Sequence, residues 1–138
     1  MGNDRLKDKA RQVQISYWVE SANHDFDVAV TLFQNKKYDW CLFIGHLVIE
    51  KVLKAIFIDK NSSKIPPKIH NLVRLSELSN IEISESKKLL LDKVNDFHIA
   101  TRYPDFKFKF YKTCTKNFTK IYFNNIKDLY KWLKSLIK

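Results

Sequence analysis

The run CLFIGHLVI (residues 41–49) decides the fold that the sequence predicts, because it is the longest strongly apolar run in the chain. It continues as EKVLKAIFID, so a helix over about residues 40–59 is apolar on nearly every side as far as Glu50. Such a helix is buried by its neighbours, and we therefore expect it to be the central helix of the domain. His46 interrupts the run and Glu50 and Lys51 end it, so it is too short and too charged to span a bilayer.

The composition predicts a single, all-helical domain. The 138 residues can bury one core, and 45% of them are hydrophobic against 29% charged. Only two glycines occur, which disfavours a sheet with many hairpins and favours long helices with few connections. We expect a polar N-terminal segment over residues 1–15, with no apolar stretch typical of a secretory signal, and one domain over residues 16–138.

Further helices are predicted on both sides of the central one. An apolar face at steps of three and four predicts a helix from Ser16 to about Asn35, and Asp39 is a plausible N-cap for the central helix. The adjacent prolines in DKNSSKIPPK predict a loop, followed by a short helix over about residues 69–79. The next helix is expected to begin after Ser84 as N-cap and to end at about Arg102, and a last helix is expected over about residues 111–137.

Positive charge is concentrated in the last quarter of the chain, where residues 107–138 hold nine lysines and a single acid, Asp128. If this segment is one helix, most of the lysines share a sector of about 100°. A solvated face that mixed both signs would gain ion pairs along the helix, so a stripe of one sign favours an anionic partner such as RNA. The favoured interpretation is nevertheless a merely solvated face, and a lysine-rich composition would produce the same pattern. The candidate anion-binding stripe consists of Lys112, Lys116, Lys120, Lys127 and Lys131.

A polar set on the predicted helices is the candidate ligand site, since charges near a core must pair or face a cavity. Glu50 lies one turn after His46 and could orient its ring by a hydrogen bond, but a satisfied core histidine is the favoured reading. For Arg102, a structural ion pair with Asp25 or Glu50 competes with bidentate binding of a phosphate. His70 is expected to have a structural role at the start of the short helix. The candidate ligand-binding residues are His46, Glu50, Lys51, Lys54, Arg102, Tyr103 and Asp105, with Asp25 and His98 in support.

Several kinds of chemistry are excluded by missing motifs. The chain has no glycine-rich phosphate loop, no G-x-S-x-G or H-E-x-x-H motif and no paired catalytic carboxylates, so no cofactor is predicted. His24 and His98 have no carboxylate or cysteine companions at ligand spacing, so no metal site is predicted. Cys41 and Cys114 are lone thiols without C-x-x-C spacing, which suits a reducing cytoplasm.

Four motifs in order along the chain resemble the HEPN domain (Higher Eukaryotes and Prokaryotes Nucleotide-binding), over about residues 18–133. They are the pattern of Trp18, Ala22, Asp25, Ala29 and Leu32, the run YDWCLFIGHLVIEKVLKAIFI, the run IPPKIHNLVRL and the run TRYPD. The resemblance implies an all-α, up-and-down bundle of four or five helices, usually as a homodimer. It also implies partnership with a minimal nucleotidyltransferase and, in many members, ribonuclease activity within toxin–antitoxin or defence systems.

The chain departs from the pattern that the ribonuclease members share. They carry Arg-x4-6-His near the start of the last long helix, whereas none of Arg5, Arg11, Arg74 and Arg102 is followed by a histidine at that distance. The motif therefore offers no obvious group that could take the proton of the 2′-hydroxyl during RNA cleavage. Arg102 can still hold a phosphate, and Tyr103 can stack on a base.

Three functions remain as hypotheses. The leading one is a non-catalytic, cytoplasmic HEPN module that binds a nucleotide or a nucleotidyltransferase partner, in which Asp105 accepts from a ribose or pairs with Arg102. The second is a divergent ribonuclease that uses Arg102 with His98 or His46 and holds RNA on the lysine stripe. The third is a pure interaction module, in which apolar faces form the dimer and the lysines dock an acidic partner.

Overall fold

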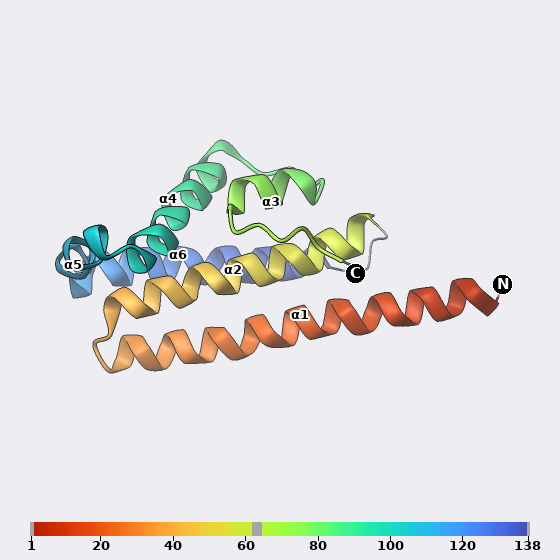
Figure 1. Cartoon of the computed structure of the whole chain (residues 1–138), viewed down its shortest axis with the longest axis horizontal. Coiled ribbons are helices and arrows are strands. Elements are labelled where there is room, and N and C mark those ends of the chain that lie inside the picture. The colour runs from red at the N-terminus through yellow and green to blue at the C-terminus, as the bar shows by residue number, and fades with distance from the viewer. Residues whose placement is uncertain (1, 62–64, 138) are drawn as a thin grey trace.

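The computed structural model describes residues 2–61 and 65–137, and within these residues the chain forms helices and no strands (Figure 1). The middle of the predicted proline loop, residues 62–64, lies outside the described residues, as do Met1 and Lys138. The all-α prediction is confirmed. The helices are α1 (Gly2–Gln34), α2 (Tyr38–Asn61), α3 (Leu72–Leu78), α4 (Glu85–Arg102), α5 (Pro104–Thr113) and α6 (Lys116–Ser135).

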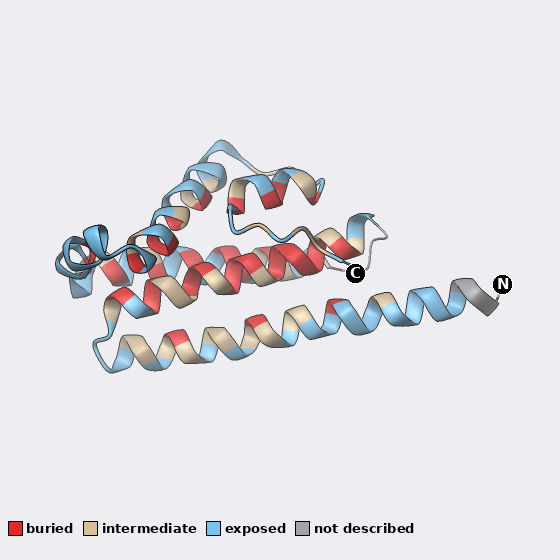
Figure 2. Cartoon of the chain, viewed as in Figure 1, coloured by how far each residue is buried: buried red, intermediate tan, exposed pale blue. Residues whose placement is uncertain are grey.

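Helix α2 is the centre of the bundle, as its apolar sequence predicts. It packs against α1, α3, α4 and α6, and Figure 2 shows buried residues along most of its length. Leu42, Ile49, Leu53 and Ile56 are fully buried there. Each such side chain contributes about 1.5–3 kcal/mol through burial, so this helix carries much of the stability of the core. None of the described helices is long and apolar enough to cross a membrane.

Helix α1 is longer than the sequence predicted, because it begins at Gly2 and not at about Ser16. Its first part projects past the end of α2 and is largely exposed (Figures 1 and 2). The prediction relied on an apolar face, which this part lacks. Polar residues with good helix propensity continue the helix without one, helped by the contact between Asp8 and Arg11 at 3.9 Å.

Both ends of α4 lie where the sequence places them. The Ser84 hydroxyl accepts a hydrogen bond from the backbone N–H of Lys87, which is the predicted N-cap. At the other end, α4 stops at Arg102 and Tyr103 has an extended backbone (φ −105°, ψ 121°), as expected of a residue before proline. Helix α3 begins at Leu72, later than predicted, because Asn71 is its N-cap. Helix α2 begins at Tyr38, so Asp39 lies in its first turn and is not its N-cap.

The prediction of one last helix over residues 111–137 is wrong. Pro104 is the first residue of a separate helix, α5, and Thr115 caps α6 by accepting from the backbone N–H of Phe118. Proline suits the first turn of a helix, because its missing N–H would have no partner there. The stripe that assumed one helix is thereby divided, with Lys112 on α5 and the other four lysines on α6.

Candidate functional site

A pocket of about 270 Å³ lies between α2, α4 and the segment that leads into α3. The central helix contributes His46, and the helix break contributes Arg102 and Tyr103. The structure therefore joins the two ends of the predicted site. The full lining is His46, His70, Asn71, Asn95, His98, Ile99, Arg102 and Tyr103.

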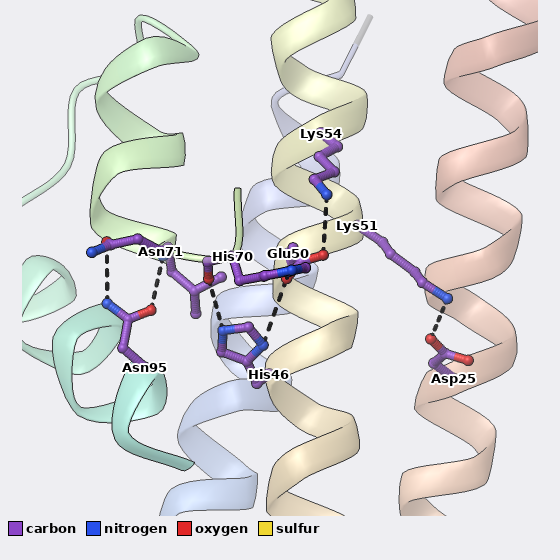
Figure 3. A network of polar contacts seen from close by, with 9 residues as sticks. Asp25, His46, Glu50, Lys51, Lys54, His70, Asn71 and Asn95 are labelled. Carbon is purple, nitrogen blue, oxygen red and sulfur yellow. Dashed lines mark hydrogen bonds and ion pairs between the residues drawn. The ribbon is translucent and has the colours of Figure 1, made fainter. Parts of the chain in front are cut away.

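Glu50 is the ion beneath this pocket, and its carboxylate is buried with two charge-assisted contacts (Figure 3). Its Oε1 accepts from Nδ1 of His70 at 2.9 Å, and its Oε2 accepts from Nζ of Lys54 at 3.2 Å. The Lys54 side chain is also buried, with its ammonium over the ring of Trp18 at 5.4 Å from the centroid. A buried carboxylate is tolerated when it is paired in this way, because Lys54 neutralises its charge and His70 donates a hydrogen bond to it.

His70 is held at two points and keeps one ring nitrogen available. Its backbone carbonyl accepts from Nε2 of His46 at 3.0 Å, and its Nδ1–H donates to Glu50. The His70 side chain is 54% exposed and lines the pocket. Because Nδ1 is engaged, Nε2 is the nitrogen that can meet a ligand. The carboxylate fixes the tautomer and the orientation of the ring, as it does in carboxylate–histidine pairs generally.

Two asparagines fix the segment that carries His70. Asn95 on α4 accepts from the backbone N–H of Leu72 at 2.8 Å, and its amide donates to Oδ1 of Asn71 at 3.2 Å. The same Oδ1 accepts from the backbone N–H of Arg74 and caps α3. The start of α3 is thus tied to α4 beside the pocket (Figure 3).

His46 is a neutral core histidine in this arrangement. Burial, followed by the neighbouring His98, lowers the pKa of His46 to about 4. Its Nε2 carries the proton, because the carbonyl of His70 can only accept. The Nδ1 then presents a lone pair 3.9 Å from Oε1 of Glu50 and has no hydrogen bond among the described residues. A hydrogen bond between His46 and Glu50, the alternative to a core histidine, is therefore not formed, since Glu50 binds His70 and Lys54 instead.

His98 packs its ring against the other two histidines. The centroid of the His98 ring lies 4.5 Å from the centroid of the His46 ring and 5.0 Å from that of the His70 ring. The ring of Phe43 also stacks on the ring of His98. Burial and the charges of His70 and Arg102 lower the pKa of His98, although Glu50 opposes them. The residue is 9% exposed, so its ring forms a flat wall of the pocket and holds the imidazole of His70 in place.

Arg102 and Tyr103 supply the exposed rim of the pocket. Among the described residues, Arg102 makes no ion pair, so the structural pairing with Asp25 or Glu50 is absent and its guanidinium is left for a ligand. The ring of Tyr103 is 56% exposed beside it. A planar, permanently charged donor next to an open aromatic ring suits a phosphate attached to a flat base.

The remaining candidate residues lie outside the pocket. Lys51 points to the opposite side of α2, where its Nζ binds Asp25 at 2.6 Å and the hydroxyl of Ser21 at 2.8 Å (Figure 3). Asp105 is exposed in the first turn of α5, where a carboxylate is favourable for the helix dipole. All five lysines of the stripe are exposed. No group of three or more His, Cys, Asp or Glu side chains in the described residues is arranged to hold a metal ion.

Sequence reasoning missed the contribution of His70. Its partner Glu50 lies 20 positions earlier, and no local pattern links the two residues. The available signal was the position of His70 shortly after two prolines, which makes an extended approach to the following helix. A side chain at such an approach can face the neighbouring helices.

Comparison with known proteins identifies the family. The model of the HEPN domain matches residues 15–136, so the chain belongs to the HEPN domain family. Among curated proteins, none matches the chain significantly. A solved structure, that of TT1696 from Thermus thermophilus, is similar with a TM-score of 0.73 and 16% sequence identity, and the match covers 90% of this chain and 98% of that one. This likeness supports the helical-bundle fold.

Proposed function

We propose that this HEPN domain binds a nucleotide through the pocket between His70 and Arg102. The observation that carries the proposal is the guanidinium of Arg102, which lies at the rim of a pocket with no carboxylate partner among the described residues. Because His46 has a lowered pKa and is neutral at pH 7, Arg102 is the permanent cation of the pocket. A phosphate can accept from the guanidinium of Arg102, while Tyr103 stacks on the base.

The test is calorimetric titration of the purified protein with ATP and with GTP. Binding is expected for the wild type and a large loss is expected for Arg102→Ala, since the fork that holds the phosphate is removed. The matched control is Arg74→Ala, because Arg74 is also exposed but pairs with Glu77 at 3.2 Å on α3. No binding at millimolar nucleotide would overturn the proposal.

A second candidate function is cleavage of RNA, and the pair formed by Glu50 and His70 favours it. Nε2 of His70 can take the proton of a 2′-hydroxyl while the 2′-oxygen attacks the adjacent phosphorus. The bond to the 5′-oxygen then breaks, which leaves a 2′,3′-cyclic phosphate and a 5′-hydroxyl that takes a proton from solvent. Arg102 would stabilise the charge on the phosphate. His70 replaces His98 and His46 in this role, because both of those rings are buried.

Cleavage is tested with tRNA and mRNA as substrates, and with His70→Gln beside the wild type. Gln keeps a donor for Glu50 but cannot accept a proton, so activity should be lost while the fold is kept. Equal cleavage by both proteins would identify a contaminating nuclease.

The proposal extends to partners. HEPN domains commonly dimerise, and we propose a homodimer that acts in the cytoplasm with a minimal nucleotidyltransferase, in a toxin–antitoxin or defence setting. Buried free thiols at Cys41 and Cys114 support a reducing compartment. Sedimentation equilibrium tests the dimer. Co-purification with a neighbour-encoded protein tests the partner, and strong salt sensitivity would indicate that the exposed lysines of the stripe dock it.

A further inference from the structure

Three hollows adjoin one another around α4, and together we call them the α4 groove. The first is the pocket of His70 and Arg102, with Ile99 in its wall. The second, of about 250 Å³, shares Ile99 with the first and adds Asp96, Ala100 and Phe106. The third, of about 240 Å³, shares those three residues with the second. Because neighbouring hollows share wall residues, they adjoin one another from the pocket at α2 to α5, with the side chain of Ile99 between the first and the second.

The lining of the groove alternates apolar surface with cations. Phe106 is 55% exposed and forms a wall of the second and third hollows. Lys93 and Lys109 flank the third hollow, and Arg102 lies in the first. Asp96 is the acid of the groove, so cations outnumber acids along it. The core does not need the exposed ring of Phe106, because the buried ring of Phe110 already fills the core at this end of the bundle.

We propose that the α4 groove binds a single-stranded nucleic acid, with Phe106 stacked on a base between a phosphate at Arg102 and a second phosphate at Lys109. This inference rests on the nucleotide site proposed above, which forms the first hollow. A strand, unlike a mononucleotide, offers a flat ring and an anion at each repeat, which matches the alternation along the groove. A duplex keeps its bases stacked inside and cannot present one to Phe106. The carboxylate of Asp96 can accept from base amino groups and give a preference among bases.

The experiment measures fluorescence anisotropy of labelled RNA and DNA oligonucleotides of two, six and twelve residues, with a hairpin duplex beside them. We expect affinity to rise with length and the duplex to bind more weakly. Phe106→Ala should weaken binding of the longer strands roughly 5- to 100-fold, as loss of one stacked base does. Phe108→Ala is the matched control, since Phe108 is 65% exposed on the same helix but does not line the groove.

A second pair of variants tests the phosphate at the far end. Lys109→Ala should weaken strand binding and reduce the slope of log affinity against log salt by about 0.7. Lys107→Ala should leave both unchanged, because the ammonium of Lys107 lies over the ring of Trp40, 5.1 Å from its centroid, and outside the groove.

The outcomes separate this inference from the proposed function. If ATP binds with a requirement for Arg102 while Phe106→Ala and Phe108→Ala behave alike, the groove is wrong and the nucleotide site stands. If strands bind and require Phe106 and Lys109 but not Arg102, the stacked base and the phosphate at Lys109 stand, whereas the phosphate at Arg102 and the nucleotide site are both wrong. If neither ligand binds, or if the duplex binds as tightly as the strands, the groove proposal is overturned. A difference between RNA and DNA would show whether the 2′-hydroxyl is read.

Discussion

The Nδ1–H of His70 donates to Oε1 of Glu50 at 2.9 Å, so an imidazole that is half exposed is oriented by a carboxylate that is almost wholly buried. The two residues belong to different parts of the chain, since Glu50 lies in the middle of α2 and His70 precedes α3. The contact therefore joins the stability of the core to the geometry of the pocket. Substitutions of Glu50 are therefore expected to lower stability, whereas substitutions of His70 are expected to affect the pocket.

Glu50→Gln should destabilise the protein by about 3 kcal/mol, because it leaves the buried ammonium of Lys54 without a counter-charge. Urea unfolding measures the loss. The control is Glu77→Gln, which removes a surface ion pair with Arg74 and should cost less than about 1 kcal/mol. Equal stability of Glu50→Gln and wild type would contradict this expectation and show that Lys54 finds another partner.

His46 predicts a specific loss of stability in acid. Burial lowers its pKa from 6.5 to about 4, so the unfolded chain binds a proton in this range and the folded chain does not. Stability is complete above about pH 6.5 and falls as the pH drops towards 4, by about 3 kcal/mol in total. Urea unfolding at pH 7 and at pH 4 measures this loss. His46→Gln keeps a donor for the carbonyl of His70 but cannot be protonated. Its free energy of unfolding should therefore fall by about 3 kcal/mol less than that of the wild type between pH 7 and pH 4. Parallel losses in the two proteins would contradict the pKa shift.

Asp25 and Lys51 should matter for stability and not for the pocket. Their ion pair at 2.6 Å joins α1 to α2 on the side away from His70. Asp25→Asn leaves the partly buried Lys51 unpaired and is expected to cost about 1–2 kcal/mol in urea unfolding, less than for a fully buried pair. Calorimetric affinity for nucleotides should stay at the wild-type value. A weakening as large as that of Arg102→Ala, in a variant that remains folded, would place Asp25 in the site after all.

Gly45 allows close contact between α2 and α6. A Cβ at this position would lie 3.0 Å from Cδ1 of Ile126, a fully buried side chain. Gly45→Ala gains about 1 kcal/mol of helix propensity, but it presses on Ile126. Ile126→Val removes the Cδ1 atom, so the two changes together should be more stable than the sum of the single changes by about 1 kcal/mol. A double-mutant cycle of urea unfolding measures the coupling. Strictly additive changes in the free energy of unfolding would show that the side chain of Ile126 moves aside without cost.

The sequence was sufficient for the core and for the ends of α4. An apolar run identifies α2, Ser84 provides a cap and Pro104 disfavours helix at the residue before it, and each of these signals acts within a few residues. Periodicity also separates Lys51 from the pocket. His46, Glu50 and Lys54 follow one another at steps of four along one face, whereas Lys51 is turned about 100° from Glu50.

Three features could not be predicted from the sequence: the contact between His70 and Glu50, the first part of α1, and α5. They depend on contacts between distant residues or on weak local signals. Nothing near His70 in the sequence shows that its ring reaches Glu50, because the packing of α2 against the approach to α3 creates that contact. The exposed first part of α1 has no apolar face to reveal it. The alternation of Phe and Lys in DFKFKFYKT obscured α5, since a period of two is typical of a strand. The proline at its first position outweighed that pattern.

The separation of α5 from its neighbours, by Pro104 at one end and by Cys114 and Thr115 at the other, has an evolutionary consequence. Only Phe110 of this short helix is buried, so most of its side chains can be exchanged without repacking the interior. Relatives of this protein can therefore vary the exposed residues of α5 while the scaffold beneath this helix is inherited unchanged.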